Sequence, residues 1–233
     1  MGILYIVGTP IGNLEDITLR ALRVLKEVDV ILCEDTRVTQ KLLARHEIVA
    51  KQLATYNEQE SGVTAGKIIQ WLEAGKSVAL VSDAGTPGIS DPGAVLVEKI
   101  RTHLKTSTSD VEIKIESVPG PSALTAALSI AGVPVHDFVF LGFLPHKKGR
   151  ETLFKEIAES ERTVVFYESP HRILKALTSL QKFAPGKKVI IARELTKIHE
   201  EITSGTASEL LEFFKSNPKK VRGEFVVLVN TLL

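Results

Sequence analysis

The sequence has few of the residues and patterns that would identify a class of protein directly. Among its 233 residues there is one cysteine, Cys33, which excludes an internal disulfide and is typical of a reducing compartment. No Cys and His cluster has the spacing of zinc ligands, so we expect no metal. No apolar run approaches the roughly 20 residues of a membrane helix, and residues 1–6 lack the basic start of a signal peptide. These absences predict a cytoplasmic protein that does not enter the membrane.

An excess of charge of one sign is also missing. The chain has 29 Lys and Arg residues against 28 Asp and Glu residues, a formal net charge of +1, so the overall balance identifies no partner. Basic clusters are local, at residues 146–150, 187–188 and 219–222. Each cluster alone is typical of a solvated turn, but clusters that share a face would bind a phosphate backbone.

The signatures of common nucleotide sites are absent as well. The loop at residues 8–13, Gly-Thr-Pro-Ile-Gly-Asn, follows an apolar stretch, but it does not fit the G-x-G-x-x-G pattern. No Gly-Lys-Ser/Thr sequence follows it either. This argues against a conventional nicotinamide or ATP site.

What is present is a regular alternation of apolar strands and amphipathic helices. With 44% hydrophobic residues the chain can bury a substantial core. In the first half, strands are predicted at residues 3–7, 28–33, 77–81 and 112–118, with a weaker one near 52–55, and helices between them. This alternation indicates a mostly parallel sheet covered on both faces. A helix rich in small residues is predicted at 124–131, with Pro121 in its first turn.

The second half alternates in a similar way. Its predicted strands are residues 138–141, 163–167, 188–192 and 224–229. Its predicted helices are 150–157, 171–180 and 207–214, the last with an N-cap at Thr206. We therefore expect an α/β fold of two domains, residues 1–133 and 134–233, with a cleft between them.

Three loops with little side-chain bulk follow strands of the first half. They are residues 8–13, 82–93 and 119–123, all rich in Gly and Pro. Gly and Pro punctuate ordinary turns too, but ligands of open α/β sheets bind where strands end, and three such loops favour a binding site. We expect a Gly85→Val change to remove ligand binding and to leave the fold largely intact.

Charged residues also follow strand ends repeatedly. Residues 33–37 read Cys-Glu-Asp-Thr-Arg, residues 166–172 read Phe-Tyr-Glu-Ser-Pro-His-Arg, and residues 192–197 read Ala-Arg-Glu-Leu-Thr-Lys. A cleft would need such side chains. The structural alternatives are a helix cap at Asp35 or Thr36 and ion pairs on the surface.

These motifs, taken in order, resemble the tetrapyrrole methylase superfamily, the class III S-adenosylmethionine-dependent methyltransferases. Within it, the chain is similar to the ribosomal small-subunit methyltransferase I family. The matching segments span nearly the whole chain: residues 8–14, 33–37, 81–87 with 90–93, 119–123, 142–145, 166–172 and 192–197. The Ser-Asp-Ala-Gly-Thr-Pro run at 82–87 is specific to this subgroup, because precorrin methylases usually carry a Gly-Asp-Pro-type loop there.

The resemblance implies a two-domain fold with S-adenosylmethionine in the cleft between the domains. Backbone amides of the loop around Asp83 and the start of the helix near Pro121 suit the carboxylate or ring nitrogens of this cofactor. Apolar walls from Pro10, Phe143 and Leu144 suit its adenine. The expected cofactor-binding residues are Pro10, Asp83, Ala84, Gly85, Thr86, Ser122, Ala123, Phe143, Leu144, Tyr167, Glu194 and Leu195.

The implied reaction is methylation of the ribose 2′-oxygen of a cytidine in the decoding region of 16S ribosomal RNA. Positioning supplies much of the rate of such a displacement, and a base would help to deprotonate the hydroxyl. The candidate bases are Glu34, Asp35, Glu168 and Lys197, of which Lys197 would need a depressed pKa. The residues expected to bind RNA phosphates are Arg37, Lys147, Lys148, Arg150, Arg172 and Arg193.

The residues alone leave two other functions open, a methylase of a tetrapyrrole or a protein side chain and a silent nucleotide-binding module. The subgroup motifs decide for RNA, with an assembled small ribosomal subunit as partner. Relatives are usually homodimers, so we expect a homodimer. Two features depart from the family: Tyr56 stands where a His often precedes the Asn57-Glu58 pair, and many members continue into a helical extension beyond the position of Leu233.

Overall fold

A computed structural model describes residues 1–56, 63–91, 93–106, 111–133 and 135–230. The Asn57-Glu58 pair, Pro92, the stretch 107–110 and position 134 lie outside the described residues. Contacts between Cα atoms divide the chain into two compact units, Met1–Ser122 and Ala123–Leu233. This division assigns the helix after Ser122 to the second unit, whereas the boundary at 133/134 stays a prediction.

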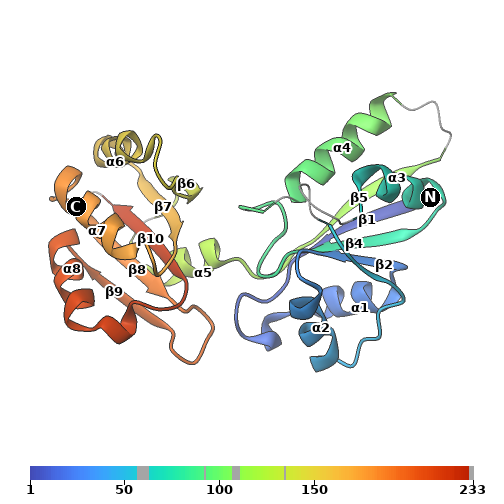
Figure 1. The fold of residues 1–233 in the computed structure, drawn as a ribbon, viewed down its shortest axis with the longest axis horizontal. Helices are drawn as coiled ribbons and strands as arrows, with labels where there is room; N and C mark the ends of the chain where they lie inside the picture. The colour runs from blue at the N-terminus through green and yellow to red at the C-terminus, as the bar shows by residue number, and fades with distance from the viewer. Residues whose placement is uncertain (57–62, 92, 107–110, 134, 231–233) are drawn as a thin grey trace. The chain divides into compact units, whose positions relative to one another are not determined.

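The first unit is a parallel five-stranded sheet in the order β3-β2-β4-β1-β5 (Figure 1). Its strands are β1 Gly2–Val7, β2 Val30–Cys33, β3 Leu53–Thr55, β4 Ser77–Val81 and β5 Ile113–Val118. Its helices are α1 Leu19–Glu27, α2 Thr36–Arg45, α3 Ala65–Glu73 and α4 Gly93–Thr106, with a 3-10 turn at Leu14–Asp16. The predicted parallel sheet is confirmed.

Helices cover both faces of this sheet because both faces are apolar. Leu25 of α1 and Leu43 of α2 belong to one core cluster, together with alternate strand residues. Ile68 of α3 and Leu96 of α4 belong to the cluster on the other side. Strands buried on both faces read as continuous apolar runs, and β2 is buried at all four positions.

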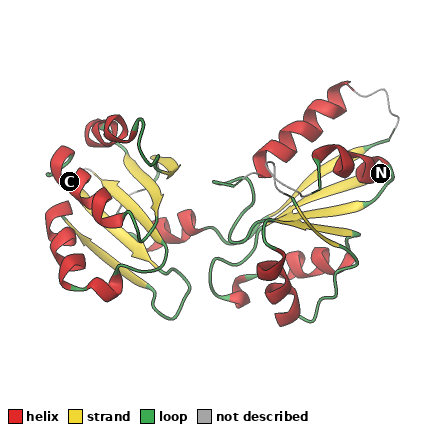
Figure 2. Ribbon diagram, viewed as in Figure 1, coloured by secondary structure: helices red, strands yellow, loops and turns green. Residues whose placement is uncertain are grey.

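The second unit is a five-stranded mixed sheet in the order β6-β7-β10-β8-β9 (Figure 2). Its strands are β6 Phe138–Phe143, β7 Thr163–Glu168, β8 Lys188–Arg193, β9 Glu201–Gly205 and β10 Phe225–Asn230. Only β6 and β7 run parallel, and the other pairs are antiparallel. The helices are α5 Ala123–Ile130, α6 Arg150–Glu159, α7 Ile173–Phe183 and α8 Ala207–Ser216, with a 3-10 turn at Pro218–Lys220.

Two details differ from the sequence-based expectation. Strand β9 was not predicted, since its residues alternate between intermediate and exposed and contain no apolar run. Pro121 lies two residues before α5 rather than in its first turn.

The predicted cap of α8 is confirmed as a capping box, in which the Thr206 hydroxyl accepts from the Glu209 amide and the Glu209 carboxylate accepts from the Thr206 amide. No described helix is long and apolar enough to cross a membrane.

Candidate functional site

The three Gly- and Pro-rich loops of the first unit meet at one edge of its sheet. The register aligns Val7, the last residue of β1, with both Val81 and Val118, so three adjacent strands end at the same level. Thr9 then exchanges two backbone hydrogen bonds with Gly85, at 2.9 and 3.1 Å. The Thr86 hydroxyl donates to the carbonyl oxygen of Pro121 at 3.2 Å. The predicted convergence of the loops is confirmed.

Two glycines allow the β1 and β5 loops to touch. A Cβ atom added to Gly8 would lie 2.8 Å from the Cα and N atoms of Gly120, and one added to Gly120 would lie 2.8 Å from the Gly8 carbonyl oxygen. Neither position tolerates a side chain unless the backbones separate. Sequence reasoning did not single out this pair, although glycine after a strand is the signal that marks such a close approach.

Buried hydroxyls connect the β1 and β4 loops, and sequence reasoning missed these as well. Thr9 is 2% exposed, and its hydroxyl donates to the Ser82 carbonyl oxygen at 3.1 Å. The Ser82 hydroxyl donates to the Gly85 carbonyl oxygen at 3.2 Å. Gly85 itself has φ 82°. A Gly85→Val change would therefore place a β-branched residue in the left-handed region, so we now expect a cost to the loop in addition to any lost binding.

Carboxylates gather beside these loops, at the ends of β2 and β4. The Asp35 amide donates to Asp83 Oδ1 at 3.0 Å, and the Asp83 amide donates to Glu34 Oε1 at 3.4 Å. Glu34 is exposed as a residue, but partial burial of its carboxylate raises its pKa. The negative charges of Asp83 and Asp91 add to the rise, against a lowering by the Asp83 amide. Among the candidate bases of this unit, Glu34 has a pKa shifted in the direction that proton abstraction requires.

Asp35 has a structural task. Its Oδ1 accepts from the Arg37 amide at 2.8 Å, which caps α2, and its Oδ2 pairs with Arg37 Nη2 at 2.7 Å. The hydrogen bonds from the Arg37 side chain and amide lower the pKa of Asp35 to about 2. A carboxylate held this acidic is a weak base. Arg37, expected to bind phosphate, is exposed but is engaged in this pair.

An Asp35→Ala change is expected to lower the free energy of unfolding by about 1 kcal/mol, because α2 loses its N-cap. Asp35→Asn keeps the cap and loses only an exposed ion pair, so its stability and methyl-transfer rate should stay near wild type. Urea denaturation and single-turnover assays measure both. A large loss of rate in the Asn variant at unchanged stability would return Asp35 to the role of base.

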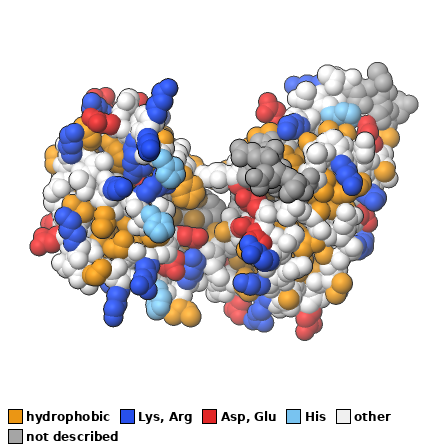
Figure 3. Space-filling view, in the orientation of Figure 1, with side chains coloured by type: hydrophobic (Ala, Val, Ile, Leu, Met, Phe, Trp, Pro, Cys, Tyr) orange, Lys and Arg blue, Asp and Glu red, His pale blue; other side chains and the backbone are white. Residues whose placement is uncertain are grey.

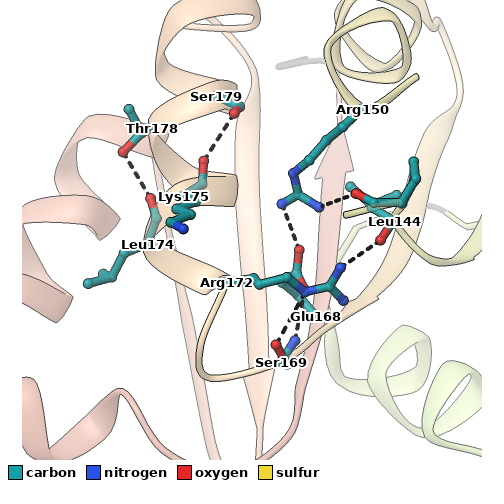
Figure 4. A network of polar contacts seen from close by, with 10 residues as sticks. Leu144, Arg150, Glu168, Ser169, Arg172, Leu174, Lys175, Thr178 and Ser179 are labelled. Atoms are coloured by element: carbon teal, nitrogen blue, oxygen red, sulfur yellow. Dashed lines mark hydrogen bonds and ion pairs between the residues drawn. The ribbon is translucent and has the colours of Figure 1, made fainter. Parts of the chain in front are cut away.

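In the second unit, Glu168 lies between two arginines (Figure 4). Its side chain is 0% exposed, and its Oε2 and Oε1 atoms pair with Arg150 Nη2 and Arg172 Nε, both at 2.8 Å. Arg172 also donates to the Leu144 carbonyl oxygen at 2.8 Å, and Arg150 to that of Pro145 at 3.1 Å. The structure thus places Glu168, expected as a base, and the two expected phosphate ligands in one internal network.

The segment after β8 holds Arg193, Glu194 and Lys197. Burial by itself would lower the pKa of Lys197, but hydrogen bonds to Glu194 and Glu224 outweigh it and raise the pKa. A Lys197 base would need a depressed pKa, and this shift has the opposite direction, so Lys197 is poorly suited to that role. Arg193 is buried and donates to the carbonyl oxygens of Arg222 and His199. Glu194 and Thr196 have φ values of 53° and 64°, backbone strain of the kind that clusters at functional sites.

The remaining predicted residues differ in accessibility. Ala84, Lys147 and Lys148 are exposed, and Ser122 and Ala123 stand at the start of α5. Phe143 is 55% exposed and packs edge-on against Tyr167, with ring centroids 5.4 Å apart. Pro10 and Leu195 are buried, and Leu144 is part of the second unit's core. Leu144 packs in the core of the second unit, and its expected place in an adenine wall stays a prediction.

No group of three or more His, Cys, Asp or Glu side chains is placed to hold a metal ion in the described part of the chain. The loops of the first unit carry little side-chain bulk, and the carboxylates of Glu34 and Asp83 lie beside them.

Comparison with known proteins identifies the class to which this fold and site belong. The family model for Tetrapyrrole (Corrin/Porphyrin) Methylases matches residues 3–211. The fold is similar to that of uroporphyrin-III C-methyltransferase from Thermus thermophilus, solved with S-adenosylhomocysteine, at a TM-score of 0.66 and 21% identity, over 98% of this chain and 97% of that one. The chain belongs to the tetrapyrrole methylase family.

Closer relatives specify the branch. Ribosomal RNA small subunit methyltransferase I of Thermotoga maritima is 46% identical over 230 residues, which are 99% of each chain. The protein of that name from Vibrio cholerae is 47% identical over 232 residues, 98% of this chain and 77% of the relative. Within the tetrapyrrole methylases, the chain is a member of the ribosomal RNA small subunit methyltransferase I family, as its motifs indicated.

Proposed function

We propose that this protein transfers a methyl group from S-adenosylmethionine to the ribose 2′-oxygen of a cytidine in 16S ribosomal RNA of the small subunit. The observation that carries the proposal is the 46% identity to a ribosomal RNA small subunit methyltransferase I over 99% of both chains. The matched region covers 99% of both chains, so it includes the loops of the candidate site.

The residues of the first unit fit the cofactor. Gly8 and Gly120 let the backbones of the β1 and β5 loops pack directly against each other, and Gly85 adopts a left-handed conformation in the β4 loop. Glu34, Asp83 and Asp91 supply negative charge for the ammonium and sulfonium groups of S-adenosylmethionine. The cofactor supplies an electrophilic methyl group. The chain's own residues then hold both reactants in line, and Glu34 is our candidate for accepting the hydroxyl proton.

The deciding experiment is methyl transfer from labelled S-adenosylmethionine to small ribosomal subunits that lack the modification. We expect label in a cytidine ribose of the 16S RNA, and none in fully modified subunits. Tetrapyrroles and total protein serve as alternative acceptors in parallel reactions. Calorimetry with S-adenosylhomocysteine separates the outcomes: cofactor binding without transfer to any acceptor would indicate a silent binding module instead.

The balance between the affinities for S-adenosylmethionine and S-adenosylhomocysteine should depend on pH. Only the first carries the sulfonium charge, and it favours an ionised Glu34, whose pKa is raised by burial and by Asp83 and Asp91. As pH falls through that raised pKa, Glu34 takes up a proton and the preference for S-adenosylmethionine should weaken. Calorimetric titration at several pH values measures the ratio. It should be constant in a Glu34→Gln variant, and a constant ratio in the wild type would remove Glu34 from the site.

We also propose that the protein forms a homodimer in the cytoplasm. Strand β6 is an edge strand with one neighbour in the sheet, and it carries the exposed apolar side chains of Phe138 and Phe143. An exposed apolar edge strand can pair with a strand of another chain. A second copy is the partner we expect there. Light scattering at micromolar concentration should give twice the chain mass, and a Phe143→Lys change should shift the protein toward the monomer. Monomeric wild type would contradict this assembly.

A further inference from the structure

The loop between β6 and α6 is fixed at several points along its length. Leu144 and Pro145 are held through their carbonyl oxygens by Arg172 and Arg150, at 2.8 and 3.1 Å. The Arg150 amide then donates to the Lys147 carbonyl oxygen at 3.3 Å, and Gly149 has φ 81° and ψ −10°. These values describe a type II turn with glycine at its third position. We call residues 145–150 the basic turn.

The basic turn presents two lysines at its tip. Lys147 and Lys148 occupy the first and second positions of the type II turn, and both are exposed. Neither ammonium group has an ion-pair partner among the residues that the structure describes. The arginines expected beside them as phosphate ligands are 14% exposed and are already paired with Glu168. Among these four cations, the two left available to a ligand are therefore the lysines.

One buried carboxylate connects the anchors of the turn. Glu168 Oε2 accepts from Arg150, and Oε1 accepts from Arg172 and from the Ser169 amide at 2.9 Å. Each guanidinium in turn donates to a carbonyl oxygen at the start of the loop. Because a guanidinium is planar and its donors have fixed directions, fixing one side of it also fixes the other. The position of the basic turn thus depends on Glu168.

The charge distribution favours a polyanion at the second unit. Its sequence contains 16 Lys and Arg residues against 12 Asp and Glu residues, whereas the first unit has 13 against 16. The near-neutral chain therefore divides into parts of net charge +4 and −3. In Figure 3, Lys, Arg and His side chains gather near the middle of the visible face of the second unit. An RNA backbone is attracted to the positive unit and repelled by the negative one.

We propose that Lys147 and Lys148 bind backbone phosphates of the RNA substrate, and that Glu168 is a positioning residue that holds the basic turn for this contact. The proposal rests on the proposed function. A turn that is already ordered loses little backbone freedom when RNA binds, so the anchoring strengthens binding without touching the RNA. It replaces two expectations from the sequence, namely Glu168 as a base and the two arginines as phosphate ligands.

The lysine contact is tested with a Lys147→Ala/Lys148→Ala double variant and unmodified small subunits. We expect KM for the subunit to rise several-fold and the slope of log affinity against log salt to flatten by about 1.4, for two lost contacts to single-stranded RNA. Affinity for S-adenosylhomocysteine should not change. The matched control is Lys215→Ala/Lys219→Ala, which removes the same charge from α8 and the 3-10 turn that follows it. Equal effects in both double variants would mean that only net charge matters and would overturn the proposal.

The positioning role is tested with Glu168→Gln, where charge and position predict opposite results. The change adds one unit of positive charge, so electrostatic attraction alone would lower KM for the subunit. Positioning predicts a higher KM at unchanged kcat, with faster trypsin cleavage between Lys147 and Lys148. A fall in kcat at unchanged KM would instead make Glu168 a base, and a lowered or unchanged KM would also overturn the proposal.

A fallback keeps this test decisive. If Glu168→Gln does not fold, Arg150→Gln is measured in its place, because it leaves Glu168 paired with Arg172 while it releases Pro145. Because this change removes a positive charge, a raised KM would not separate charge from position, so trypsin cleavage is the readout. Cleavage between Lys147 and Lys148 should be faster, and unchanged cleavage would overturn the proposal. The activity of the wild type distinguishes failure of the proposed function from failure of the role proposed for the basic turn. Without transfer by the wild type the proposed function fails, whereas an active wild type with variants of unchanged KM removes only the role of the basic turn.

Discussion

A Gly8→Ala protein is expected to lose binding of S-adenosylmethionine and S-adenosylhomocysteine and to unfold about 3 kcal/mol more easily, at the upper end of overpacking costs. The added Cβ atom would lie 2.8 Å from backbone atoms of Gly120. Backbone atoms cannot rotate away as a side chain can, so the β1 and β5 loops must separate. Urea denaturation gives the change in stability, and calorimetry on the folded variant gives the binding.

Gly66→Ala is the matched control. Gly66 lies inside α3, where an added Cβ atom has no neighbour nearer than 4.0 Å. Alanine there should raise stability by about 0.5–1 kcal/mol, because glycine costs conformational entropy within a helix. Cofactor binding should remain at the wild-type level. If Gly8→Ala behaved like this control, the contact between the two loops would not be needed for the site, and the cofactor would have to be placed elsewhere.

The first unit was predictable because its physical signals are local. Strands buried on both faces are apolar runs, as β2 is throughout and β4 is after Ser77. Each run is followed within two residues by a charged residue, Glu34 or Asp83, which the sequence shows directly. Strand β9 carried no such signal. Its stability comes from antiparallel pairing with β8, a long-range contact that the sequence of β9 does not encode in its own pattern.

In the candidate site, too, some features could be predicted from local sequence, whereas others depend on contacts between residues far apart in the chain. The convergence of three loops followed from the rule that parallel strands end together, and the register of Val7 with Val81 and Val118 bears it out. The hydrogen-bond and ion-pair partners of the charged residues could not be predicted from the sequence. Whether Glu168 or Lys197 acts as a base depends on which partners lie within hydrogen-bond distance. The partners distant in sequence are Arg150 at the start of α6 for Glu168 and Glu224, just before β10, for Lys197. A sequence shows that a charge is present but not what neutralises it.

Removal of the Glu168 carboxylate is the second change for which we expect a large effect. Glu168→Ala should lower the free energy of unfolding by about 3–5 kcal/mol, because it leaves two guanidinium groups, each 14% exposed, without their counterion. The loss should change little with salt, since screening is weak for buried charges. Denaturation in urea at low and high salt measures both quantities.

The stability lost in Glu168→Ala includes the cost of leaving two mostly buried arginines without a counterion, so it does not measure the net contribution of the ion pairs to stability. A triple variant separates these two quantities. When Glu168→Leu, Arg150→Met and Arg172→Met are combined, no charge is left buried without a partner, and stability should return to within about 1–2 kcal/mol of the wild type or exceed it. Such a protein should bind S-adenosylhomocysteine yet methylate small subunits with a raised KM, since its basic turn has lost both anchors. If the triple variant were as unstable as Glu168→Ala, the network would stabilise the fold itself. If the triple variant kept the wild-type KM, Glu168 and its two arginines would contribute to stability alone and would have no role in RNA binding.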